Sequence, residues 1–83
     1  MPEPRNGHVQ VSGLPWLARM IDKARLERQG EINRYDLEYP CPMDKNLLRQ
    51  LGIDAHTFQD IAVTAQTDEQ IVSELKRIGA HIS

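Results

Sequence analysis

The sequence has little of what marks secreted, membrane-spanning or nucleic-acid-binding proteins. Its single cysteine cannot close an internal disulfide, and its longest apolar runs are three residues. A membrane-spanning helix needs about 20 apolar residues, and the first residues lack the apolar run of a secretory signal. Ten Lys and Arg against twelve Asp and Glu leave a net charge of −2, without a basic excess for nucleic acid or anionic lipid. We therefore expect a cytoplasmic protein that makes no membrane contact.

The length of 83 residues suits one small domain. A chain of this size has one small hydrophobic core and buries a modest fraction of its surface. Because ligand pockets occupy roughly 300 to 1,000 Å³, we expect the core to be too small for an internal cavity. Any activity is then expected at the surface.

Apolar residues recur at helical spacing in four segments, at residues 15–29, 42–51, 54–65 and 67–78. Pro15 suits a first helical turn and Gly30 a helix stop. Asp54 is a good N-cap, and Thr67 with Gln70 forms a capping box. The predicted inward residues are Leu17, Met20, Ile21, Ala24, Leu47, Leu48, Leu51, Phe58, Ile61, Ala62, Ala65, Ile71, Val72, Leu75 and Ile78. The predicted fold is all-α, a single small bundle of about four helices.

Three segments outside these helices complete the domain organisation. Residues 1–13 are rich in Pro and Gly, which predicts a flexible N-terminal arm, with a short extended segment at 8–11 as the alternative. Residues 14–79 form the predicted helical domain and 80–83 a C-terminal tail. Between the first and second helices lies a Tyr- and Pro-rich connector, where two prolines flank Cys41 and favour a stiff, non-helical path.

Three separated motifs carry a resemblance to a known family. They are the run WLARMIDKAR at 16–25, the run YPCPMD at 39–44, and LGID at 51–54 followed by Phe58. Over residues 14–78 the chain resembles the family of small bacterial proteins known as domain of unknown function 5069. The resemblance implies a soluble bacterial protein, with no activity, cofactor or catalytic residue to carry over. We expect the chain to be shorter at its N-terminus than those relatives. Surface that an extra segment covers in them is then covered here by a partner or a second copy, or left uncovered; the alternatives stay open.

The polar side of the first helix and the connector supply the candidate binding residues. Arg19 and Lys23 lie one helical turn apart and are able to form an anion site, or to pair with acids of the connector such as Asp36 and Glu38. A buried Asp22 would need a partner, which we expect to come from the connector. Tyr35 and Tyr39 are expected either to form a patch that faces a partner or to cover the open end of the core. The candidate residues are Arg19, Asp22, Lys23, Arg25, Tyr35, Tyr39, Cys41 and Asp44.

The stretch from Leu48 to Phe58 has the apolar and turn spacing of a helix-turn-helix. Its second helix has no Lys or Arg, although phosphate contacts supply most non-specific affinity for DNA. Leu48 also occupies a position where such motifs need a small residue. Two short helices joined at Gly52 are therefore the favoured interpretation, and nucleic acid is an unlikely partner.

Cys41 is the one thiol, and a helix predicted to begin beside it could activate it. A small buried apolar residue is the simpler interpretation. Three scattered histidines and one cysteine lack the spacing of a metal site, so we predict neither metal nor cofactor. No catalytic motif is found.

These observations favour a non-enzymatic protein-interaction or regulatory module that binds a protein partner or a second copy of itself. The alternatives are a helix-turn-helix-like DNA-binding protein and a small-ligand or thiol-based protein that uses Cys41.

Overall fold

The structure, a computed structural model, describes residues 3–82. Within that range the regular elements are α1 (Leu17–Arg28), the 3-10 helix η1 (Ile32–Tyr35), α2 (Pro42–Leu51), α3 (Ala55–Thr64) and α4 (Asp68–Arg77). The same range contains no strand, and residues 8–11 contribute only an isolated bridge between Val11 and Leu14. The all-α prediction is confirmed.

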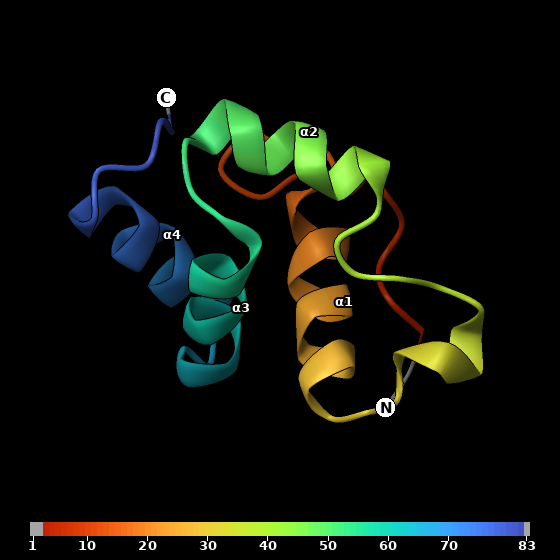
Figure 1. Ribbon diagram of the computed structural model, residues 1–83. Helices are drawn as coiled ribbons and strands as arrows, with labels where there is room; N and C mark the ends of the chain where they lie inside the picture. Colours follow the sequence, from red (N-terminus) through yellow and green to blue (C-terminus); the bar gives the residue numbers. More distant parts are fainter. Residues whose placement is uncertain (1–2, 83) are drawn as a thin grey trace.

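The helices are arranged around α1 (Figure 1). α3 lies beside α1, α4 packs against α3, and α2 crosses the N-terminal end of α1. The N-terminal segment passes alongside α1 and reaches α2 before the chain turns into α1. Within residues 3–82, no helix is long and apolar enough to cross a membrane.

Local capping explains where α2, α3 and α4 begin and end. The Asp54 side chain accepts the Thr57 N–H, and Thr67 and Gln70 form the predicted capping box. Hydrogen bonds from Thr57 hold the pKa of Asp54 below its ordinary range. α2 ends at Gly52, whose φ of 80° is a conformation that glycine adopts without strain. The signals at these three helices were local and predicted them well.

The core lies where the four helices meet, and it contains most of the predicted inward residues. The fully buried ones include Leu17, Met20, Ile21, Ala24, Leu51, Phe58, Ala62, Ile71 and Leu75. Leu26 and Ile32 are buried although they were not predicted, because η1 folds against the end of α1. The prediction for Ile78 was wrong: it follows the last turn of α4 and is 39% exposed.

The predicted start of the first helix was also wrong, and the connector is not wholly non-helical. α1 begins at Leu17 instead of Pro15, because Trp16 has a φ of 75° and lies outside the helix. A positive φ is uncommon for a bulky residue, so contacts from elsewhere in the fold must hold Trp16 there. The connector contains the helical turn η1, where the Arg34 amide donates to the Glu31 carbonyl. Further along the connector, the Tyr39–Pro40 peptide is cis.

The two terminal segments lie against the helices. Val11 and Leu14 pack on the core from the N-terminal side, and Ala80 and Ile82 from the C-terminal side. The His81 amide donates to the carbonyl of Leu51 at 2.9 Å, which attaches the end of the chain to α2. Residues 1–2 of the predicted arm and residue 83 of the predicted tail lie outside the described residues. The flexibility of the arm stays a prediction.

Candidate functional site

A buried ion pair joins α1 to the start of α2. Lys23 Nζ lies 2.7 Å from Asp44 Oδ2, and the two side chains are 2% and 0% exposed. The sequence placed Lys23 on the polar side of the helix, and that placement was wrong. The long side chain reaches an opposite charge on Asp44, which makes its burial tolerable.

Two half-buried residues, Trp16 and Cys41, complete what we call the buried cluster with Lys23 and Asp44. Asp44 Oδ2 also accepts the Cys41 N–H at 3.0 Å, while Oδ1 accepts the indole N–H of Trp16 at 2.7 Å. Lys23 Nζ donates to Cys41 Sγ at 3.0 Å. No buried side-chain nitrogen or oxygen among the described residues lacks a hydrogen-bond partner. The arrangement is that of a structural cluster, whose polar atoms are used in holding it together.

The cluster fixes the position of the Trp16 ring. Besides its bond to Asp44, the ring carries two cations near its face, with Arg19 5.5 Å and Lys23 5.8 Å from its centroid. The Trp16 amide donates to the Gly7 carbonyl at 2.8 Å. A Cβ at Gly7 would lie 2.5 Å from Trp16 Cε3, so the N-terminal segment approaches the ring as closely as only glycine allows. These contacts hold Trp16 in its left-handed conformation.

An open groove of about 690 Å³ runs between the N-terminal segment, the start of α1 and α2. We call it the Trp16 groove. Met43, which is 51% exposed, contributes an unburied apolar side chain. The residues that line the groove are Asn6, Gly7, His8, Pro15, Trp16, Arg19, Met43, Asn46, Leu47 and Gln50. None of these is acidic, and Arg19 carries their one permanent charge.

Arg19 lies at the edge of two hollows. It lines the Trp16 groove and also a polar hollow of about 540 Å³ formed with the N-terminal segment and residues 33–37, where Tyr35 lies. Arg19 Nη1 donates to the Arg5 carbonyl at 3.2 Å. Among the ion pairs of residues 3–82, none involves Arg19. Its guanidinium is therefore held by one hydrogen bond, and the residue is half-buried.

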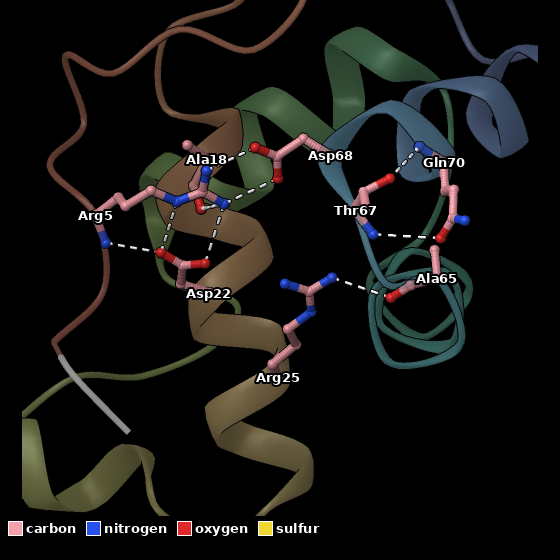
Figure 2. Close-up of polar contacts among 8 residues, drawn as sticks. All are labelled: Arg5, Ala18, Asp22, Arg25, Ala65, Thr67, Asp68 and Gln70. Atoms are coloured by element: carbon pink, nitrogen blue, oxygen red, sulfur yellow. Dashed lines mark hydrogen bonds and ion pairs between the residues drawn. The ribbon is translucent and has the colours of Figure 1, made fainter.

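A second ion-pair site holds the N-terminal segment to the helices (Figure 2). The Arg5 side chain lies between Asp22 on α1 and Asp68 on α4, with Nε 2.9 Å from Asp22 and Nη1 2.7 Å from Asp68. The Arg5 amide also donates to Asp22 at 2.8 Å. Hydrogen bonds from Arg5 hold the pKa of Asp68 below its ordinary range, and the bonds to Asp68 and Asp22 raise the pKa of Arg5. We call these three residues the Arg5 clamp.

The structure brings some predicted residues together and separates others. Lys23, Cys41 and Asp44 meet in the buried cluster, so the first helix is tied to the connector as expected. The tie does not use Asp22, which pairs with Arg5 instead, and Lys23 pairs with Asp44 instead of Asp36 or Glu38.

Two other candidates support the fold away from the groove. Arg25 donates to the Ala62 and Ala65 carbonyls and so caps the C-terminal end of α3. Its bond to Ala65 is drawn in Figure 2. The Tyr39 hydroxyl donates to the Ala55 carbonyl at 2.7 Å. Burial, followed by the charges of the nearby Asp44 and Asp54, raises the pKa of Tyr39.

The sequence did not identify Arg5 or Met43 as candidate residues, and it placed Trp16 only within the predicted first helix. Arg5 gave no signal, because its partners are 17 and 63 positions away. Trp16 is the one tryptophan of the chain, and its indole N–H needs a partner once it is covered. That requirement was the available clue to a nearby acceptor.

The helix-turn-helix spacing corresponds to α2, the turn at Gly52 and α3. His56 and Asp60 lie on the outer face of α3, 3.3 Å apart, and Asp60 also pairs with Arg28. α3 itself contains no Lys or Arg. α3 therefore supplies none of the cations that phosphate contacts require, and the nearby Arg28 is paired with Asp60.

Comparison with known proteins places the chain in a family. No curated protein matches the sequence. The family model described as Domain of unknown function (DUF5069) matches residues 1–82, which is nearly the whole chain. The match agrees with the resemblance seen in the three sequence motifs. The chain therefore belongs to the DUF5069 family of domains of unknown function.

Proposed function

We propose that this chain is a non-enzymatic protein-interaction module whose binding surface is the Trp16 groove. The observation that carries the proposal is the apolar floor of the groove, to which Met43, 51% exposed, and the half-buried Trp16 contribute. Trp and Arg are the residue types enriched at the energetic centres of protein interfaces. Trp16 and Arg19 together provide both.

The surroundings of the groove favour binding through preorganisation. The Trp16 ring is fixed by Asp44 on one side and approached by Gly7 on the other. A partner therefore meets side chains that have already lost their conformational freedom, which lowers the entropic cost of association. The polar groups of Asn6, Asn46 and Gln50 line the same groove and suit a hydrogen-bonding rim.

The proposal is tested by capturing partners from an extract of the source organism with matched variants. Met43→Glu places a charge in the groove, whereas Val63→Glu makes the same change at a residue 38% exposed on α3. We expect a partner that is retained by the wild type and by Val63→Glu and lost by Met43→Glu. Equal retention by the two variants, with unchanged circular dichroism, would show that the groove is not the binding surface.

The two alternatives from the sequence stay predictions. DNA binding requires association that weakens steeply with salt, and duplex titration at low salt tests it. A thiol function requires Cys41 to react with an alkylating reagent faster than a model thiol. A rate that matches the model thiol would count against that function.

A further inference from the structure

The groove has an unusual electrostatic character for an acidic chain. The protein carries a net charge of −2, yet no Asp or Glu lines the Trp16 groove. Arg19 supplies a permanent positive charge there. The residues that line the groove thus carry a net positive charge in a negatively charged molecule, which favours an anionic ligand.

Three of the nearby carboxylates are committed to other donors, whereas Glu3 and Asp36 line the polar hollow together with Arg19 and form no ion pair with it. Asp22 and Asp68 bind Arg5. Asp44 binds Lys23, and its other oxygen accepts the Trp16 indole N–H. The buried cluster and the Arg5 clamp together leave Arg19 as a guanidinium without an acidic partner among the described residues.

Arg19 is also held in a suitable orientation. Its guanidinium carbon lies 5.5 Å from the centroid of the Trp16 ring, and its Nη1 donates to the carbonyl of Arg5. Arg5 is in turn fixed by two carboxylates. A planar guanidinium presents several donors and pairs with a carboxylate through two parallel hydrogen bonds. The remaining donors of Arg19 are therefore ready for such a group.

From this juxtaposition we infer that the occupant of the Trp16 groove is an acidic peptide segment of a partner protein. One Glu or Asp side chain of the segment binds Arg19, and a neighbouring large apolar side chain covers Trp16 and Met43. The inference rests on the proposed function, and it adds the chemistry of the partner. A carboxylate with no apolar neighbour would leave Met43 exposed, and an apolar segment with no acid would leave Arg19 unpaired.

The test is a titration of the ¹⁵N-labelled full chain, followed by NMR, with two capped peptides, acetyl-Leu-Glu-Leu-amide and acetyl-Leu-Gln-Leu-amide. We expect the Glu peptide to shift the resonances of Trp16, Arg19 and Met43 and to bind about tenfold more tightly than the Gln peptide, because a charged pair replaces a neutral hydrogen bond. Arg19→Gln should remove that difference. Arg49→Gln, the same change at an exposed residue of α2 outside the groove, should preserve it.

The possible results separate this inference from the proposed function. Equal affinity for the two peptides at the groove overturns the carboxylate preference and leaves a peptide-binding groove in place. No shift with either peptide at millimolar concentration overturns the inference, while the capture experiment with Met43→Glu still decides the proposed function. N-acetyl-leucine, whose carboxylate is terminal, is the third probe. Tighter binding of N-acetyl-leucine than of the Glu peptide would assign the site to a chain terminus and overturn the inference.

Discussion

Two ion-pair sites attach distant segments to α1, and they differ in their access to water. The Lys23–Asp44 pair has side chains that are 2% and 0% exposed, whereas Arg5, Asp22 and Asp68 in the clamp are 34%, 18% and 30% exposed. Water screens charges at the surface and reaches buried ones poorly. We therefore expect the buried pair to be costly to break and insensitive to salt, and the Arg5 clamp to be weaker and adjustable.

The two ion-pair sites also hold different parts of the Trp16 groove in place. The buried cluster fixes Trp16, which is the apolar floor. The Arg5 clamp fixes the N-terminal segment, whose residues 6–8 form a wall and whose Arg5 carbonyl holds Arg19. The floor is therefore expected to persist under conditions that loosen the wall.

The largest expected effect comes from Asp44→Ala. It leaves the Lys23 ammonium buried without its counter-charge and the Trp16 indole N–H without an acceptor. Breaking a buried pair from one side costs about 3 to 5 kcal/mol of unfolding free energy. Urea unfolding measures this loss of unfolding free energy. The double variant Lys23→Met with Asp44→Leu removes both charges, and it should recover most of the lost stability. A double variant as unstable as Asp44→Ala would mean that the unpaired Lys23 charge is not the cause.

Arg5→Ala is expected to have a smaller effect, about 1 to 2 kcal/mol, because the clamp is partly exposed and its charges are screened. The variant also leaves Asp22 and Asp68 near each other without a cation. Urea unfolding gives the magnitude, and hydrogen exchange should show loss of protection at the Trp16 amide. Arg49→Ala is the control at an exposed position. A loss as large as that of Asp44→Ala would contradict the distinction between the two sites.

Acid should weaken the Arg5 clamp. Arg5 depresses the pKa of Asp68 in the folded state, so the resulting stability is fully present above the unfolded aspartate pKa of about 3.9. It is lost as the pH falls through the lower folded value. The stability difference between the wild type and Arg5→Ala should therefore be constant at neutral pH and become smaller below about pH 4. Thermal unfolding at several pH values measures this difference, and one that grows in acid would contradict the assignment.

Salt should change the unfolding free energy least, and it should distinguish the Arg5 clamp from the buried pair most clearly. Raising the ionic strength from 0.01 M to 1 M shortens the Debye length from about 30 Å to about 3 Å. The cost of Arg5→Ala should then fall by roughly half, while the cost of Asp44→Ala should not change. Urea unfolding of both variants at the two ionic strengths makes the comparison. An equal salt response at both sites would show that the buried pair is reached by water.

Particular residues show how far sequence reasoning reached. Asp54 capped α3, and Thr67 with Gln70 capped α4, as their local spacing indicated. Lys23 was predicted at the surface, because helical periodicity records which face is apolar and carries no information on whether a distant acid will meet a lysine. Trp16 was assigned to the first helix for a similar reason, since the contacts that turn it out of the helix come from Gly7 and Asp44.

What the sequence determined by itself is the set of helices, most of the core and the family, because caps, 3.6-residue periodicity and contiguous motifs are local properties. The tertiary structure alone decided which charges are paired and which remain available. Arg5 meets Asp68 across 63 positions and Lys23 meets Asp44 across 21. Pairing at such separations depends on how the helices pack, and so does the lack of an acidic partner for Arg19 within residues 3–82.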